Sequence, residues 1–243
     1  MERLTKEDKK NLKSVEKHMG IRFRNRHLLK KALTHKSYAN EKKLEATFHN
    51  ERLEFLGDAV LELVVSHVIM EQYPAASEGD LSKVRAAMVN EKTLASMAKF
   101  LEIGDKLYLG KGEEMGQGRD KSSLLSDAYE ALLGAIYLDR GFKKAFKVLQ
   151  KHAQILLRKV NEEGFYKDYK TQLQETSQTL FKTIPRYRLV EEVGPDHDKT
   201  FTVNIFIQNE LYGVGHGKSK KDAEQNAAKQ ALEVLEKGLS QED

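Results

Sequence analysis

The sequence contains no cysteine, and only 3 of its 243 residues are proline. Without cysteine the chain cannot form disulfide bonds, thiolate zinc sites or a cysteine nucleophile, and this composition suits a reducing compartment. The longest apolar run, Leu63 to Met70, is too short to cross a bilayer, and the opening segment MERLTKEDKK is too charged for a secretion signal. We therefore expect a cytoplasmic protein with no membrane partner.

A large excess of charge of one sign is also lacking. The chain has 41 Lys and Arg against 37 Asp and Glu, a formal net charge of +4. This balance permits binding to nucleic acid without demanding it. Apolar residues make up 40% and charged residues 32% of the chain, so we expect a buried core with a highly charged surface, and the length suits two domains.

Apolar residues recur at helical spacing through the first two-thirds of the sequence. Leu94, Met97, Ala98 and Leu101 illustrate the pattern. It predicts an all-α domain over residues 1–158. Within this domain the glycine-rich segment GKGEEMGQG, residues 110–118, is expected to form a mobile loop.

The pattern changes in the last third of the chain. Residues 159–167 lose helical periodicity and are expected to form a linker. Beyond them the sequence predicts a helix, three strands and a helix in a domain over residues 168–243, with strands at 187–193, around 201–207 and at 211–215. The last helix is expected to begin at Ser219, which forms a capping-box pattern with Asp222.

Carboxylates repeat at helical spacing in the segment NERLEFLGDAVL. Glu51, Glu54 and Asp58 are three and four residues apart, so they share one face of a helix. The same stripe continues into Leu61 and Val65. This acidic face therefore runs into apolar surface, which favours partial burial over simple solvation.

A second acidic pair occurs in the segment SLLSDAYEALLGAIYLD. Asp127 and Glu130 are three residues apart, and their stripe continues through Ala131, Gly134 and Leu138. We expect this face to be packed as well. Because glycine allows backbones to approach closely, Gly134 and the glycine at position 57 favour a contact between the two helices that brings both carboxylate pairs together.

Four partly buried carboxylates repel one another unless they are protonated or bound to cations. Mg²⁺ prefers oxygen ligands and leaves positions open for water and phosphate, which suits phosphodiester hydrolysis. The alternative is an ordinary solvated face paired with nearby bases. Arg52 is a candidate neutralising partner, and spacing alone leaves both interpretations open.

Three segments together resemble the ribonuclease III family. NERLEFLGDAVL is similar to its signature, and SSLLSDAYEALLGAIYLD and ALTHKSY are similar to two further blocks of its nuclease domain. The resemblance implies that catalysis and metal binding belong to the same four acids: Glu54, Asp58, Asp127 and Glu130. It gives Glu51 and Glu78 a secondary place in the cleavage centre, with a structural or RNA-positioning part as an equal alternative.

The resemblance also implies an activity and an assembly. Members of the family are homodimeric endonucleases that cut double-stranded RNA with Mg²⁺, for which Mn²⁺ is expected to substitute, and use no small-molecule cofactor. The expected products carry 5′-phosphate and 3′-hydroxyl ends with short 3′ overhangs, and the expected substrates include ribosomal RNA precursors. Phe55 matches a residue that inserts into the partner subunit; the alternative is a core aromatic of its own domain.

The predicted α-β-β-β-α domain resembles a double-stranded RNA-binding domain. Its lysines stand at the start of the last helix, where the helix dipole adds to their attraction for phosphate. Glutamines on the first helix match positions that meet the minor groove, and a loop histidine matches a second groove contact. The expected RNA-binding residues are Gln174, Gln178, His197, Lys218, Lys220 and Lys221. Asp196 and Asp198 flank the histidine and are expected to weaken phosphate attraction there.

Two other functions remain possible at this point. The chain could be an RNA-binding protein without catalysis, but the complete set of four acids argues against that reading. It could also be a nuclease for duplex DNA, since carboxylate and metal chemistry does not distinguish sugars. The RNA-binding domain, which relies on 2′-hydroxyls, argues against this alternative.

Overall fold

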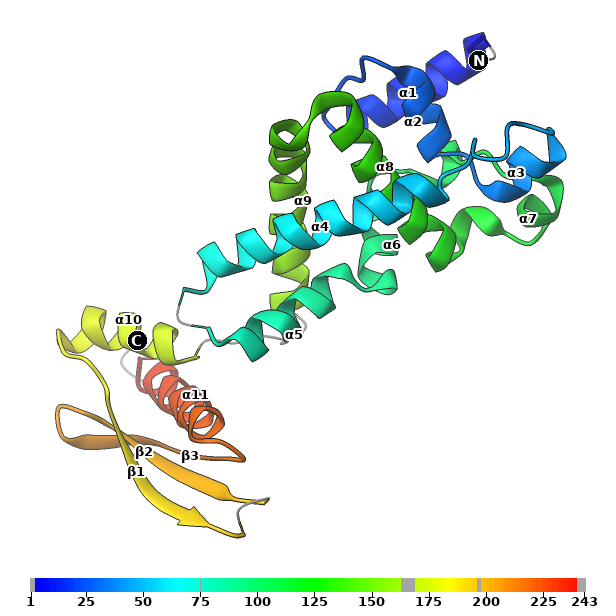
Figure 1. The fold of residues 1–243 in the computed structure, drawn as a ribbon. Coiled ribbons are helices and arrows are strands. Elements are labelled where there is room, and N and C mark those ends of the chain that lie inside the picture. Colours follow the sequence, from blue (N-terminus) through cyan, green and yellow to red (C-terminus); the bar gives the residue numbers. More distant parts are fainter. Residues whose placement is uncertain (1–2, 75, 163–168, 196–197, 240–243) are drawn as a thin grey trace. The chain divides into compact units, whose positions relative to one another are not determined.

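The structure is a computed structural model that describes residues 3–74, 76–162, 169–195 and 198–239. The chain divides into two compact units, residues 1–166 and 167–243 (Figure 1). Each unit has a separate hydrophobic core. The prediction of a helical domain followed by an α-β-β-β-α domain is confirmed.

The described residues of the first unit form helices, connecting segments and an isolated β-bridge between Thr34 and Tyr108. Its helices are α1 (Lys6–His18), α2 (Arg26–Ala32), α3 (Lys36–Glu41), α4 (Glu51–Gln72), α5 (Glu78–Val89), α6 (Glu91–Phe100), α7 (Lys111–Met115), α8 (Ser122–Arg140) and α9 (Phe142–Glu162), with short 3₁₀ turns at Gly104–Lys106 and Gly118–Asp120. Within the described ranges, no helix of either unit is both long and apolar enough to span a membrane.

Helix starts in this unit follow local side-chain chemistry. Thr5 accepts a hydrogen bond from the Asp8 amide at 3.0 Å, and the Asp8 carboxylate accepts one from the Thr5 amide at 2.8 Å. This reciprocal pair satisfies two amides that would otherwise lack partners at the start of α1. Ser77 and Asp80 form the same arrangement at the start of α5, and Asn90 caps α6.

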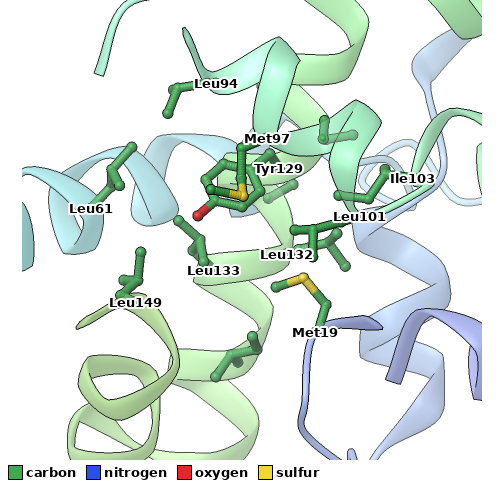
Figure 2. Packing of buried hydrophobic residues seen from close by; sticks show 14 of the residues in the cluster. Met19, Leu61, Leu94, Met97, Leu101, Ile103, Tyr129, Leu132, Leu133 and Leu149 are labelled. Carbon is green, nitrogen blue, oxygen red and sulfur yellow. The ribbon is translucent and has the colours of Figure 1, made fainter. Parts of the chain in front are cut away.

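Helix α8 forms the centre of the first unit. It packs against α2, α4, α6 and α9, and it is buried along most of its length. Tyr129 of α8 is fully buried and lies among Leu61 of α4, Met97 of α6 and Leu133 (Figure 2). Its hydroxyl lies 3.0 Å from Nδ1 of His152 on α9. Burial lowers the pKa of His152 to about 4, so the imidazole is neutral at pH 7.

The second unit consists of α10 (Tyr169–Phe181), β1 (Arg186–Val193), β2 (Thr200–Ile207), β3 (Glu210–Gly217) and α11 (Lys220–Leu239). The strands form an antiparallel sheet in the order β1-β2-β3, and both helices lie on one face of it (Figure 1). Alternating residues of β2, Val203, Ile205 and Ile207, are buried beneath the helices. Gly213 lets α11 approach β3 closely, because a Cβ there would collide with backbone of that helix.

Three local expectations were wrong. Residues 111–115 form α7 instead of a loop, since the Glu41 carboxylate accepts the Lys111 amide and ion pairs at 2.7–2.8 Å join Glu113 and Glu114 to Lys121 and Arg119. Helix α9 continues to Glu162, four residues into the expected linker, and residues 163–167 of that linker lie outside the described residues. The strand expected at 211–215 is longer at both ends.

Candidate active site and nucleic-acid interface

The two helices that carry the predicted acids cross in close contact. A Cβ added at Gly57 of α4 would come within 2.5 Å of the Glu130 carbonyl carbon, and one added at Gly134 of α8 would collide with the backbone of Leu53. Neither glycine can be replaced without moving the helices apart. The predicted approach of the two helices through these glycines is confirmed.

This crossing brings the four predicted acids together. Burial raises the pKa of Glu54, and repulsion from Asp127, Glu51 and Asp58 adds to the shift. Burial also raises the pKa of Asp127. Leu61 and Val65 are buried below the acids, as expected. Of the acids on this stripe only Glu54 is partly buried, however, and Glu51 and Asp58 are exposed, contrary to expectation. On α8 the stripe is buried at Ala131 and Gly134, but Leu138 is 55% exposed, contrary to expectation, near the end of the helix.

Glu130 has the most perturbed carboxyl group of the cluster. Burial is the main cause and the charges of Asp58, Glu54 and Asp127 follow, and together they raise its pKa to about 8. At neutral pH without a cation this group is therefore largely protonated. Any bound cation that neutralises the neighbouring carboxylates reverses this effect.

The chemistry of the cluster fits a hard divalent cation, because it consists of carboxylate oxygens that repel one another. The described residues nevertheless contain no three His, Asp or Glu side chains already arranged to hold an ion jointly. The arrangement in this chain is a group of neighbouring acids without a preformed ligand shell.

A lysine faces the cluster from α3. Nζ of Lys36 lies 3.1 Å from Oε1 of Glu51, and this contact lowers the pKa of Glu51 and raises that of Lys36. The charges of Asp127 and Glu54 also raise the pKa of Lys36. Sequence reasoning missed this residue, although it lies in the ALTHKSY block. Arg52, the neutralising partner considered from the sequence, forms no ion pair with the described acids.

The two secondary acids occupy different places. Glu51 belongs to the rim of the cluster, since its charge raises the pKa of both Glu54 and Asp127. Glu78 begins α5 and accepts a hydrogen bond from Ser82 at 2.9 Å. It lines a small groove with Met70, which lies about 18 Å along α4 from Asp58. Within one chain, therefore, Glu78 is not brought to the four acids.

Phe55 lies beside the acids in the sequence but points away from the core. Its side chain is 81% exposed, among the highest values for a large apolar residue in the described chain. The alternative reading of Phe55 as a core aromatic of its own domain is therefore wrong.

In the second unit the predicted glutamines share one face of α10. Gln174 and Gln178 are exposed, whereas Leu173 and Ser177 on the same helix are fully buried. The exposed amides are therefore available to a polar partner, while an adjacent face of the same helix forms the core.

The predicted lysines gather where β3 meets α11. Ser219 caps this helix through the Asp222 amide at 3.1 Å, as expected. Lys218 and Lys220 line an open cavity of 760 Å³ beside the cap, and Lys221 lies there too. Nζ of Lys218 forms an ion pair with the Asp198 carboxylate at 2.5 Å.

One further residue expected to contact RNA, His197, lies outside the described residues, and so does Asp196, which was expected to weaken phosphate attraction. Lys220 is 3.9 Å from Glu192 across the same region, so acids accompany the lysines on the described part of this surface.

Comparison with known proteins agrees with both units. A family model described as Ribonuclease-III-like matches residues 25–156, and one described as double-stranded RNA binding motif matches residues 169–235. A relative named Ribonuclease 3 from Syntrophobacter fumaroxidans is 47% identical over 228 residues, 92% of this chain and 94% of that protein. Another, from Pelotomaculum thermopropionicum, is 49% identical over 88% of this chain and 89% of that protein.

A solved structure resembles the first unit in particular. It is a nuclease domain of ribonuclease III from Campylobacter jejuni, 43% identical, with a TM-score of 0.54, covering 61% of this chain and 96% of that one. The family match, the relatives over nearly the full length and the similarity to this nuclease domain agree with one another. This chain belongs to the ribonuclease III family.

Proposed function

We propose that this chain is a metal-dependent endoribonuclease that cuts double-stranded RNA. The observation that carries the proposal is the group of four acids facing one another where α4 crosses α8, with the pKa of Glu130 raised to about 8. Neighbouring carboxylates with raised pKa values, as for Glu54, Asp127 and Glu130, are typical of a site that works with a cation. The double-stranded RNA binding motif over residues 169–235 supports the substrate class.

Glu54, Asp58, Asp127 and Glu130 would hold the divalent ion, for which we propose Mg²⁺ with Mn²⁺ as a substitute. A bound ion of this kind supplies activation of water and stabilisation of the charge that develops on the phosphate. The close contact of Gly57 with the Glu130 backbone keeps the two helices in fixed relation. The chain thereby holds the backbones that carry the acids close together, which lowers the cost of ordering the side chains around an ion.

Lys36 stands at the edge of this group and is 60% exposed. A cation there would offset the repulsion between the acids and an approaching phosphate. We propose that Lys36 and its ion-pair partner Glu51 are positioning residues. For Glu78 we propose only a secondary role in the cleavage centre, because within one chain it lies apart from the four acids.

The second unit would supply affinity for the duplex. Gln174 and Gln178 present amides that match minor-groove 2′-hydroxyls, and Lys218, Lys220 and Lys221 present charge for phosphate. His197 is proposed as a further groove contact. Domains of this kind recognise the shape of A-form RNA over about 16 base pairs more than its sequence.

We propose that the active form is a homodimer. The related Campylobacter jejuni structure is described as having structural flexibility in a region involved in dimer formation of its nuclease domain. In this chain Phe55 exposes a large apolar side chain to solvent, which favours burial against another surface. We assign Phe55 to the interface between subunits.

The remaining details stay predictions from the family. They are cleavage to 5′-phosphate and 3′-hydroxyl ends with short 3′ overhangs, processing of ribosomal and other structured RNA precursors, a cytoplasmic location and no small-molecule cofactor. The domain limits 1–158 and 168–243 also stay predictions, whereas the linker expected at 159–167 is helical as far as Glu162.

The deciding experiment incubates the purified chain with an end-labelled perfect RNA duplex of about 40 base pairs, long enough for two footprints of about 16 base pairs. Parallel reactions contain Mg²⁺, Mn²⁺ or EDTA, and a DNA duplex of the same sequence serves as the substrate control. We expect metal-dependent cutting of RNA alone. Binding without cutting would leave an RNA-binding protein, and cutting of DNA at a similar rate would overturn the substrate assignment.

A further inference from the structure

A basic cavity lies on the first unit between α1 and the segment that leads into α2. Its volume is 670 Å³, and its charged lining consists of five cations and one carboxylate: Lys10, Lys13, Lys17, Arg22, Arg26 and Glu16. The net charge of this small region is therefore +4, equal to that of the whole 243-residue chain. The near balance of charge over the full sequence conceals this local excess.

The single carboxylate that lines the cavity, that of Glu16, already has hydrogen-bond partners. Glu16 is buried and accepts hydrogen bonds from the Phe23 amide at 2.9 Å and from Nη2 of Arg26 at 2.6 Å. This pair neutralises Arg26 and holds the wall of the cavity in place. It leaves no acidic group in the lining to pair with the other cations.

The four remaining cations are exposed. Lys10, Lys13 and Lys17 occupy one face of α1 at offsets of three and seven residues, and Arg22 faces them from the following segment. Within the described ranges none of them forms an ion pair. Like charges gathered in this way repel one another, and a polyanion relieves that repulsion.

The cavity has a fixed relation to the acids, because both belong to one packed unit. The Asp139 carboxylate near the end of α8 accepts the amides of Arg24 and Asn25 at 2.8 Å each. Arg140 also donates to the Arg22 carbonyl. These bonds fasten the segment with Arg22 to α8, about 14 Å along that helix from Glu130. A nucleic-acid duplex carries roughly one charge per 1.7 Å of axis, so several phosphates fall within this distance.

We infer that Lys10, Lys13, Lys17 and Arg22 form a second phosphate-binding surface, which holds the backbone of the RNA duplex outside the cleavage centre. The inference rests on the proposed function, since it takes RNA as the polyanion. The surface belongs to the nuclease unit, so it adds affinity that does not depend on the RNA-binding motif.

The test measures binding of the full-length chain to a labelled RNA duplex of about 40 base pairs in EDTA, where cleavage is prevented, over a range of salt concentrations. The variant replaces Lys13→Gln and Lys17→Gln, because glutamine keeps helix propensity while removing charge. The matched control replaces Lys83→Gln and Lys99→Gln, two exposed lysines on α5 and α6 that do not line the cavity. Circular dichroism and melting temperature check that both variants fold.

The cavity variant is expected to lower the slope of log affinity against log salt by about two, one for each lost phosphate contact. Its loss of affinity between 50 and 200 mM salt would then be about tenfold smaller than that of the parent. The control is expected to keep the parent slope. Equal slopes for the parent and both variants would overturn the inference and leave the proposed function intact, whereas absence of RNA binding by the parent would refute the proposed function itself.

A second arm distinguishes RNA from free phosphate compounds by titrating the chain with ATP and with pyrophosphate. Saturable binding of either compound that the cavity variant loses, with unchanged RNA binding, would overturn the assignment to RNA. Weak or no binding of the free compounds, together with the altered slope on RNA, supports it.

Discussion

The acids of the first unit and the lysines of the second are both charged groups, yet they are held in opposite ways. Glu54, Asp127 and Glu130 are half-buried, and burial is the main cause of their raised pKa values. Lys218 and Lys220 are more than 60% exposed and engage nearby acids across an open cavity. A reaction centre benefits from groups fixed before substrate arrives, whereas contact with a polyanion benefits from accessible charge.

The contacts that hold the acids in place also differ from those around the lysines. The acids are supported by the buried contact of Tyr129 with His152 and by the close crossing of α4 and α8 at two glycines. The lysines stand at a helix start capped by Ser219. We therefore expect a change near the acids to affect chemistry or folding strongly, and a change at the lysines to affect affinity in small steps.

The largest expected effect is at Glu130. Glu130→Gln keeps the size of the side chain but removes its charge, so cleavage of duplex RNA in Mg²⁺ should fall by about a thousandfold or more. Duplex binding in EDTA should stay close to that of the parent. A variant that cuts at the parent rate would remove Glu130 from the proposed ligands.

The second prediction concerns acid sensitivity of the first unit. His152 has a lowered pKa of about 4, so the unfolded chain binds a proton more readily than the folded one between pH 6.5 and 4. Its contribution to stability is complete above pH 6.5 and is lost as the pH falls, to a total of about 3 kcal/mol. Urea unfolding of the parent and His152→Gln at pH 7 and 4.5 measures the difference.

Glu130 titrates with the opposite sign, because its pKa is raised, and its stabilising contribution is lost as the pH rises from 4.5 through about 8. Comparing the parent with His152→Gln at each pH cancels this contribution. An identical pH dependence of unfolding for the two proteins would contradict the assignment of acid sensitivity to His152.

Removal of the second unit tests whether the first unit carries out cleavage while the second supplies affinity for RNA. A chain of residues 1–166 has its own hydrophobic core and should fold alone. Removal of the second unit takes away the three proposed phosphate contacts of Lys218, Lys220 and Lys221. This loss should lower the affinity for duplex RNA by roughly a hundredfold at 0.2 M salt. Some cleavage should survive at low salt, and its complete loss there would mean that the nuclease unit cannot engage RNA without the motif.

The glycine crossing gives a smaller effect with a matched control. Gly57→Ala places a Cβ against the backbone of Glu130, which should destabilise the chain by about 2 kcal/mol and reduce cleavage. Gly112→Ala is the control, because nothing lies within 4 Å of the added Cβ. Equal urea midpoints for the two variants would show that the helices tolerate separation at this point.

The smallest effect is expected in the second unit. Asp198→Asn releases Lys218 from its ion pair, which should raise affinity for duplex RNA a few-fold, since exposed pairs contribute at most about 1 kcal/mol. The gain should disappear in high salt and in a Lys218→Gln background. A decrease in affinity would indicate that Asp198 positions Lys218 instead of competing for it.

Periodicity and turn chemistry determined most of the fold. The 3.6-residue spacing of apolar residues established the helical unit, and alternation over 201–207 established the central strand, because burial acts on one face of each element. The same spacing placed Glu54 and Asp58 on one face and Asp127 and Glu130 on another. The helix at residues 111–115 was not predicted, because residues distant in the sequence stabilise it. The Glu41 carboxylate, for example, accepts a hydrogen bond from the Lys111 amide.

The sequence by itself determined which acids share a helix face, and it identified the family through three motifs. Only the tertiary structure decided that Lys36 faces these acids, that Glu78 does not, and that Phe55 is exposed, since none of these follows from spacing along one helix. It also gathered Arg22 with the lysines of α1. Charge counts in a sequence sum over the whole chain, whereas electrostatic energy depends on the distances that folding sets.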